Sequence, residues 1–203
     1  MPEKIKWSID PTHSEIAFKV RHMMIANVKG RFTIFDANIY TDGKDFQTAD
    51  IDFWMDPNSI TTGDENRDKH LKGPEFFDTA NHKQIVFVSN TFRKSDKNKH
   101  YELWGDLSIR SITKNIKLDV EFGGIETDPW GKEKAGFTVT GTINRKDWGL
   151  VWDSPLNSGA AMVGDEIHIS CDVELINTGE KENKQEKKEE LRSETSETEL
   201  AEE

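Results

Sequence analysis

The chain has 203 residues, of which 34% are hydrophobic and 32% are charged, and its formal net charge is −11. This acidic balance speaks against a nucleic-acid partner, because phosphate contacts require clustered lysines and arginines. No run approaches the roughly 18 apolar residues of a membrane-spanning helix. Residues 1–7 lack the apolar stretch of a secretory leader, so we expect a cytoplasmic location, or a periplasmic one if a leader has been removed.

Residues 179–203 differ in composition from the rest of the chain. From residue 180 onward there are ten glutamates, five basic residues, two leucines and no aromatic residue. Such a segment cannot bury enough apolar surface to offset the entropy lost on ordering. We therefore expect one folded domain over residues 1–178. Residues 179–203 are expected to form a disordered acidic Glu/Lys-rich tail, either an interaction segment or a solubilising extension.

The first half of the folded part shows strand-like alternation of apolar and polar residues. Residues 16–20 and 49–55 place apolar side chains at every second position. In residues 28–39 the alternation shifts phase by one residue after Ile34, which predicts a β-bulge within one strand. Each segment has one dry face and one wet face, as antiparallel strands do.

The alternation stops between residues 59 and 80, where a helix is expected instead. Residues 64–72 are helix-forming, with acids first and bases last, an order that suits the helix dipole. The Gly73-Pro74 pair then ends the helix. A short helix is therefore predicted in the connection between the two halves of the domain.

The second half returns to alternation with a period of two. The predicted strands here are residues 85–88, 101–109, 116–122, 135–143 and 167–175. The single cysteine, Cys171, excludes a disulfide within the chain, and its place on the apolar side of the last strand predicts a buried, inert thiol. Eight one-sided strands in one small domain require either two packed sheets or a closed barrel.

Four stretches of sequence carry a resemblance to a known family. They are residues 7–22 with 30–35, residues 59–78, residues 105–113, and residues 144–152 with 164–167. In the family's order, these stretches resemble the YceI-like family of lipid-binding proteins over roughly residues 4–175. Ser111 stands where that family commonly has glycine, and the acidic tail lies outside the resemblance.

The resemblance implies an all-β fold, namely an extended antiparallel eight-stranded lipocalin-like barrel with a short helix in the mid-chain connection. It also implies a long apolar tunnel that holds an isoprenoid or other lipid chain, and a homodimer. Trp54 and Trp104, on outer strand faces, are candidates for a dimer interface or for isolated surface tryptophans. No cofactor is implied.

Alternation and the resemblance together predict which side chains line the tunnel. A filled barrel has the same alternation, so packing of these residues on each other is the competing interpretation. Phe76 and Phe77, after the helix, are candidates to close one end. The predicted tunnel residues are Ile16, Phe18, Val20, Phe32, Ile51, Phe53, Phe76, Phe77, Phe87, Leu103, Leu107, Leu118, Val120, Phe137, Val139, Ile169 and Val173.

A few polar residues are candidate contacts for a lipid headgroup. Arg67 and His70 are three residues apart, so a helix brings them to neighbouring positions. Arg145 could bind a headgroup or pair with Asp147 across a bend. Each candidate has an equally simple structural interpretation as a surface or bracing group. The candidates are Ser59, Thr61, Thr62, Arg67, His70 and Arg145.

Catalytic motifs are missing from the sequence. It has no Gly-x-Ser-x-Gly elbow, no phosphate-binding glycine loop and no His-Glu-x-x-His motif. His13 and Ser14 are adjacent, so on a strand they would point to opposite faces. We therefore expect a non-enzymatic protein with no metal, which carries or stores a long lipid. The alternatives are an enzyme housed in the barrel, or an interaction module with a filled core.

Overall fold

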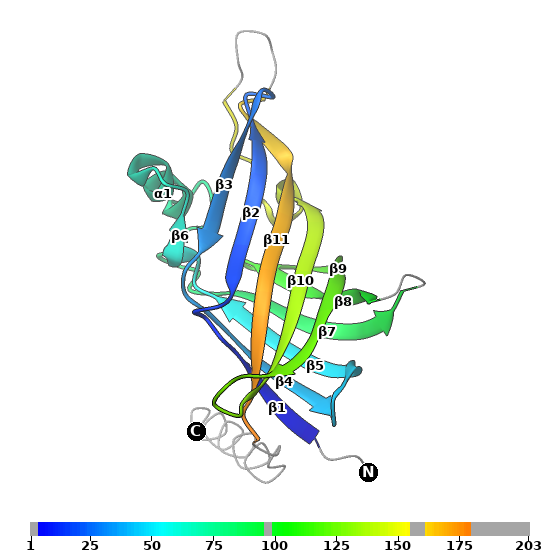
Figure 1. Cartoon of the computed structure of the whole chain (residues 1–203). Coiled ribbons are helices and arrows are strands. Elements are labelled where there is room, and N and C mark those ends of the chain that lie inside the picture. Colours follow the sequence, from blue (N-terminus) through cyan, green and yellow to red (C-terminus); the bar gives the residue numbers. More distant parts are fainter. Residues whose placement is uncertain (1–3, 96–98, 155–160, 180–203) are drawn as a thin grey trace, which may run out of the picture.

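The computed structural model describes residues 4–95, 99–154 and 161–179. The predicted tail over residues 180–203 lies outside the described residues. Within them, eight antiparallel strands form a closed barrel, because β1 pairs with both β4 and β11 (Figure 1). The barrel strands are β1 (Lys4–Ile9), β4 (Phe35–Asp42), β5 (Asp45–Met55), β7 (Ile85–Lys94), β8 (His100–Ile109), β9 (Ile112–Thr127), β10 (Glu133–Asn144) and β11 (Val163–Asn177). The predicted fold class is confirmed.

Three further strands extend the barrel wall at one end. β11 pairs with β1 through residues 175–177 and with β2 (Glu15–His22) through residues 163–172. β3 (Ala26–Phe32) then pairs with β2, and the short β6 (Ile60–Thr61) pairs with β3. In Figure 1, β2, β3 and the first half of β11 rise together above the closed part. The extension therefore lengthens the barrel on one side.

The predicted helix is confirmed as α1 (Glu65–Lys72), which lies beside β6 (Figure 1). The side chain of Asp64 caps it by accepting a hydrogen bond from the Arg67 N–H at 2.9 Å. This is the usual role of an aspartate before the first turn. Two 3₁₀ helices, η1 (Pro57–Ser59) and η2 (Arg145–Trp148), lie in two of the other connections. Among the described residues, no helix is both long and apolar enough to cross a bilayer.

The predicted bulge in residues 28–39 is wrong. The phase shift marks a break between two strands, because β3 ends at Phe32 and β4 begins at Phe35. The break is held from outside: the N–H groups of Thr33 and Ile34 both donate to the Ser59 hydroxyl at 3.1 Å. A corner of this kind sends β3 into the extension and β4 into the closed barrel.

Inward glycines leave room for aromatic rings from neighbouring strands. At Gly105 on β8, an added Cβ would lie 2.3 Å from the Phe87 ring and 2.5 Å from the Val88 carbonyl oxygen. Gly105 pairs with Ser89 on one side and with Ile116 on the other, so its backbone cannot move away from the Phe87 ring. The Phe87 side chain thus packs over the glycine.

We expect Gly105→Ala to destabilise the barrel by about 1–3 kcal/mol through overpacking. Gly136→Ala on β10 is the matched control, because nothing lies within 4 Å of the added Cβ. Urea denaturation of both variants measures the difference. Equal stability of the two variants would contradict the close packing of Phe87.

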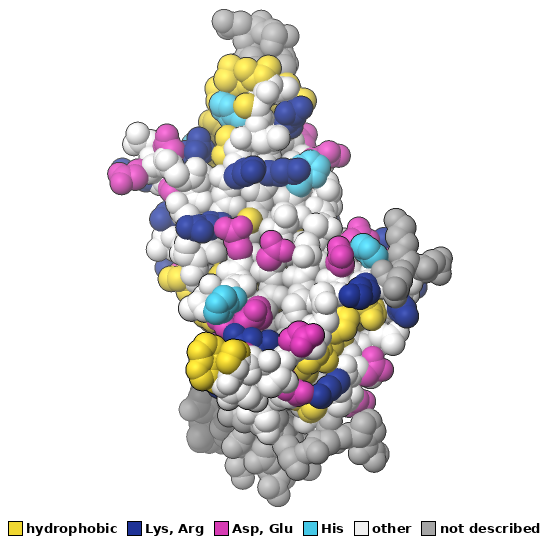
Figure 2. Space-filling model, viewed as in Figure 1, with side chains coloured by type: hydrophobic (Ala, Val, Ile, Leu, Met, Phe, Trp, Pro, Cys, Tyr) yellow, Lys and Arg dark blue, Asp and Glu magenta, His cyan; other side chains and the backbone are white. Residues whose placement is uncertain are grey.

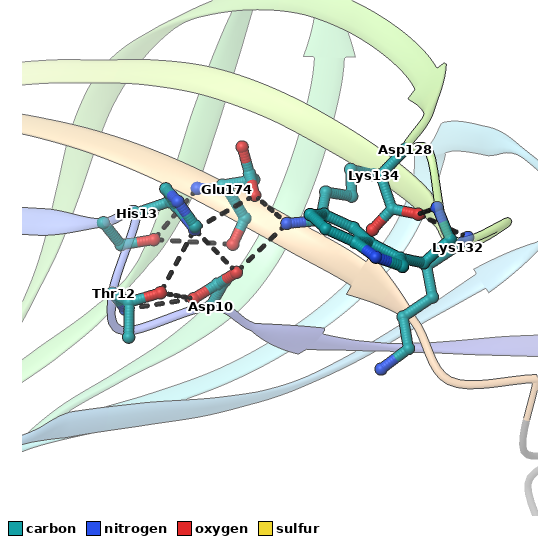
Figure 3. A network of polar contacts seen from close by, with 9 residues as sticks. Asp10, Thr12, His13, Asp128, Lys132, Lys134 and Glu174 are labelled. Atoms are coloured by element: carbon teal, nitrogen blue, oxygen red, sulfur yellow. Dashed lines mark hydrogen bonds and ion pairs between the residues drawn. The ribbon is translucent and has the colours of Figure 1, made fainter.

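The corner between β1 and β2 is fastened to β11 and β10 by a polar cluster (Figure 3). The Asp10 carboxylate accepts hydrogen bonds from Thr12 at 2.6 Å and from His13 at 2.9 Å, and contacts the Lys134 ammonium at 3.3 Å. Lys134 also donates to Glu174 at 2.6 Å. Asp10, His13 and Glu174 have a spacing that could hold a metal ion, but the Lys134 ammonium already supplies the positive charge between two of them. The polar cluster therefore joins the β1–β2 corner to β10 and β11, next to the β1–β11 pairing that closes the barrel.

Because of Asp10, we expect the stability that this polar cluster contributes to depend on pH. Burial raises the pKa of its carboxyl, but hydrogen bonds from Thr12, His13 and Lys134 outweigh burial and hold the pKa well below its usual range. A lowered folded-state pKa contributes stability above the unfolded pKa of about 3.9, and the contribution is lost as the pH falls below that value. We expect Asp10→Asn to cost about 2 kcal/mol at neutral pH.

Chemical denaturation of both proteins between pH 3 and pH 7 measures this contribution. The difference in free energy of unfolding between wild type and Asp10→Asn should become smaller as the pH falls below about 4. A difference that stays constant from pH 3 to pH 7 would show that the charge of Asp10 does not stabilise the polar cluster.

Candidate functional site: an internal cavity with a polar mouth

A cavity of about 590 Å³ lies inside the barrel. Every strand of the closed barrel contributes to its wall, and most of the lining side chains are aliphatic or aromatic. The volume falls within the roughly 300–1,000 Å³ of pockets that enclose a small ligand. The lumen of this barrel is therefore only partly filled by its own side chains.

The structure places all seventeen residues predicted for the tunnel on this cavity wall. They reach it by the expected alternation: along β2, Ile16 and Val20 are buried while Lys19 is exposed. Phe76 and Phe77 also line the cavity, from the segment after α1. The Phe77 ring packs edge-on against Phe32, with centroids 5.9 Å apart.

Sequence reasoning missed part of the wall. Ile9 comes from β1, where Ile5, Trp7 and Ile9 alternate over too short a run to predict a strand. Ala37 and Ile39, which the sequence places in the second phase of a bulged strand, face inward from β4. Further apolar lining residues outside the prediction include Phe46, Ala49, Met55, Leu71, Ile85, Phe92, Ile109, Ile116, Ile143, Ile167, Cys171 and Leu175.

Aromatic side chains close the cavity at the end formed by β1 and the β4–β5 turn. The Phe46 ring lies 5.0 Å from Trp7 and 4.9 Å from Phe137, and Phe137 stacks on Phe122 at 5.1 Å. The Trp7 indole N–H donates to the Thr41 hydroxyl at 2.9 Å, so its buried polar group is satisfied. This end is dry and tightly packed.

Polar lining residues gather at the opposite end, which we call the mouth. They come from the end of β2, from the residue after β6, from α1 and from η2. The polar residues on the cavity wall are Arg21, His22, Thr62, Asn66, Arg67, His70 and Arg145. A single elongated cavity thus has one apolar closed end and one end with cationic and hydroxyl groups.

Arg67 is held at the mouth by Thr62. Its Nε donates to the Thr62 hydroxyl at 2.7 Å and its Nη2 donates to the Thr62 carbonyl at 3.0 Å. Asp68 in turn accepts from the Thr62 N–H at 2.8 Å and from its hydroxyl at 2.6 Å. The guanidinium retains donors beyond those two bonds, since arginine carries five N–H groups. Arg67 can therefore bind an anionic or carbonyl group without losing its support.

His70 forms the other side of the mouth with two aromatic rings. Its imidazole lies edge-on to Trp152 at 4.7 Å and to Phe76 at 5.1 Å. Its Nε2 lies 2.8 Å from a Glu75 carboxylate oxygen. The ring thus belongs to a small aromatic cluster that joins α1 to the segment before β11.

Arg145 lines the cavity but its guanidinium is fully engaged in the fold. It donates to the carbonyls of Gly164 at 3.0 Å, Trp152 at 2.8 Å and Val163 at 3.3 Å, and to that of Leu150. Its carboxylate partner is Asp165 at 3.2 Å, so the anticipated pairing with Asp147 is wrong. Arg145 braces the mouth instead of offering free donors to a ligand.

Two of the predicted headgroup residues lie off the cavity. Ser59 binds the corner before β4, as described above, and Thr61 is paired with Arg31 in the β3–β6 ladder. Neither contributes to the cavity wall. The structure therefore brings together Thr62, Arg67 and His70, and leaves Ser59 and Thr61 as supports of the fold.

Cys171 is buried, as predicted, and it also lies on the cavity wall. Burial raises the pKa of its thiol to about 11. The thiol thus stays protonated at neutral pH, and a protonated thiol is a poor nucleophile. Its surroundings favour a packing role over covalent chemistry.

Comparisons with known proteins agree with this geometry. A family model described as a YceI-like domain matches residues 7–175. A UPF0312 protein of Staphylococcus aureus strain MSSA476 is 36% identical over 170 residues, which cover 83% of this chain and 96% of that protein. A UPF0312 protein of Staphylococcus epidermidis strain RP62A is 34% identical over 171 residues, covering 84% and 96%.

Solved structures share the barrel. The YCEI protein of Campylobacter jejuni superposes with a TM-score of 0.67 at 30% identity, covering 78% of this chain and 90% of that one. BcnA of Burkholderia cenocepacia gives 0.70 at 19% identity, covering 82% and 98%. A domain from Saccharophagus degradans, described as polyisoprenoid binding, gives 0.63 at 14% identity, covering 85% and 99%. The last two likenesses concern the fold.

A closed barrel around an apolar cavity with a polar mouth defines the class of β-barrels that bind hydrophobic ligands. Within that class, the matches in sequence and structure place the chain in the YceI-like family.

Proposed function

We propose that this protein binds the long apolar chain of a lipid, of polyisoprenoid or fatty-acyl type, inside its barrel and carries or stores it. The single observation behind the proposal is the cavity of about 590 Å³, whose wall is apolar except at the mouth. Burying each methylene of a ligand contributes roughly 0.8 kcal/mol, so a chain needs no directed hydrogen bond to bind. The described polyisoprenoid-binding domain of S. degradans has the same fold.

The mouth suits the polar end of such a lipid. Arg67, held by Thr62, offers its remaining N–H donors at the cavity rim, next to the His70 ring. An anionic or hydroxylated headgroup placed there would leave its chain pointing toward Phe46 at the closed end. In the proposed orientation the polar headgroup therefore stays near solvent, and the apolar chain contacts the apolar cavity wall.

Two alternatives from the sequence have weaker support. A barrel-housed enzyme needs an activated group in the cavity, whereas the Cys171 thiol on the wall has a raised pKa that disfavours the nucleophilic thiolate. An interaction module with a solid core is at odds with the open volume of the lumen. Homodimer formation stays a prediction; Trp54 and Trp104 are both half-buried on the outside.

Titration with saturated fatty acids of increasing length tests the proposal. We expect the affinity to rise about fourfold with each added methylene until the cavity is full, and then to level off. Isothermal titration calorimetry on the full chain measures each dissociation constant. An affinity that does not depend on chain length would contradict burial of the chain.

A further inference from the structure

The turn between β2 and β3 carries three consecutive exposed apolar side chains at the mouth end of the barrel. Met23, Met24 and Ile25 expose 40%, 54% and 79% of their surface. Figure 2 shows hydrophobic side chains gathered at this upper end of the molecule. Single exposed apolar residues are ordinary, but a contiguous group on a projecting tip marks an interaction surface.

The backbone of this turn is unfavourable for the residues it holds. Met23 and Met24 have φ angles of 52° and 61°, and the Ile25 N–H donates to the His22 carbonyl at 3.2 Å. Tight turns with two positive φ values favour Asn-Gly, because other side chains are strained there. The two methionines are therefore poor turn residues, and their apolar side chains call for a role outside the turn.

The exposed tip is continuous with the cavity mouth. The Met23 N–H donates to the Met162 carbonyl at 2.7 Å, and the Met162 N–H donates to the Asp153 carboxylate at 3.0 Å. Val151, two residues before Asp153, is also exposed, while Met162 lines the cavity. We call Met23, Met24, Ile25 and Val151 the apolar tip. The neighbouring residues His22, Trp152 and Met162 line the cavity, so the apolar tip lies next to the mouth.

Basic side chains lie on the outer face of the extension, three residue pairs along the β2–β3 ladder from the apolar tip. Lys19 on β2 stands opposite Lys29 on β3, and His168 on β11 stands opposite Lys19 on its other side. Figure 2 shows lysine or arginine side chains below the apolar end. Like charges facing each other across a sheet are destabilising. In a chain whose net charge is −11, this row of Lys29, Lys19 and His168 is suited to bind an anionic surface.

Two acids near the tip are already engaged. Asp165 pairs with Lys146 at 2.8 Å and with Arg145. Asp153 accepts hydrogen bonds from the Ser154, Met162 and Val163 N–H groups. The two cations compensate the charge of Asp165, and the N–H groups hold the Asp153 carboxylate against the backbone.

We propose that the apolar tip inserts into the interfacial layer of a bilayer that contains anionic lipids. Lys19 and Lys29 then face the headgroups, and the cavity mouth opens toward the membrane. Apolar side chains that enter this layer, together with basic residues against anionic lipids, are the two terms that bind peripheral proteins. Transfer of a lipid between bilayer and cavity rests on the proposed function, whereas docking itself does not.

Vesicle co-sedimentation of the full chain tests this docking. The vesicles consist either of phosphatidylcholine alone or of phosphatidylcholine mixed with phosphatidylglycerol. We expect binding to the mixed vesicles, and a loss of at least about tenfold when Met23→Asn, Met24→Gly and Ile25→Ser are combined. The first two changes suit the positive φ values, so the triple variant should melt at or above the wild-type temperature.

Two further variants separate charge from apolar contact. Lys19→Gln with Lys29→Gln should weaken binding to the mixed vesicles by about fivefold for each lysine removed. Trp130→Ser is the matched control, because Trp130 is 84% exposed but lies in the β9–β10 turn at the opposite end of the barrel. Its binding to vesicles should equal that of the wild type.

Three results would overturn the docking proposal. They are no binding of the wild type to mixed vesicles, unchanged binding of the triple variant, and a wild-type dimer that the triple variant converts to monomer, since a dimer of that kind would assign the tip to a second copy of the chain. Fatty-acid affinity, measured on the same proteins, reports on the cavity separately. Loss of docking with intact fatty-acid binding would leave the proposed function standing, and the converse would leave docking standing.

Discussion

Phe18→Glu is expected to lower the affinity for a long-chain fatty acid by at least about 100-fold, because an ionised carboxylate in an apolar cavity must be desolvated when the chain enters. Phe18 lies on the cavity wall, beside Phe32 at a ring distance of 5.8 Å. Calorimetric titration at neutral pH measures the loss. Part of the affinity should return in mildly acidic buffer, where the new carboxyl becomes protonated.

Lys19→Glu is the matched control for this substitution. Lys19 is the next residue on the same strand, and its side chain is exposed on the outer face. The same glutamate placed there should leave fatty-acid affinity unchanged. Equal losses in both variants would overturn the inside and outside assignment of β2.

Arg145→Met is expected to destabilise the barrel by about 3–5 kcal/mol, the cost of breaking a buried charged network by removing one partner. The variant would leave four backbone carbonyls without the guanidinium donor, and Asp165 would lose one of its two cationic partners. Those acceptors belong to the segments on both sides of the mouth. Urea denaturation, followed by tryptophan fluorescence, measures the loss.

Arg67→Met supplies the contrast at the same mouth. Among the described residues its guanidinium bonds to Thr62 alone, and it keeps donors for a ligand. The variant should weaken binding of a fatty acid while its thermal stability stays close to that of the wild type. Selective loss of binding in Arg145→Met, with unchanged stability, would mean that the assignments of the two arginines must be exchanged.

Alternation predicts the in and out faces of a strand, and this explains why the tunnel residues could be identified. Phe53, Leu107 and Val139 all occupy the apolar phase of strongly periodic segments, and each lies on the cavity wall. The helix at residues 65–72 is equally predictable, because its charge order and the Gly73-Pro74 stop are local features. Local sequence patterns therefore predict features that depend on a single segment, such as the inward face of a strand or the position of a helix.

Features that depend on partners far away in the sequence were not predictable in this way. A phase shift of one residue fits both a bulge and a corner. What decides between them is that β3 pairs with β2 while β4 pairs with β1 and β5. Ser59 likewise looked like a headgroup contact and proved to hold that corner, 25 residues away from Ile34. Nor can alternation show whether a lumen is open, because filled and hollow barrels share the same pattern.

Native mass spectrometry of the full chain, purified without detergent, tests the central claim most directly. If the cavity carries a lipid, part of the protein should appear with an added mass in the range of long-chain lipids, and Phe18→Glu should remove that species while Trp130→Ser, away from both the cavity and the apolar tip, retains it. The contrary result is bare polypeptide alone, both as purified and after incubation with lipid vesicles.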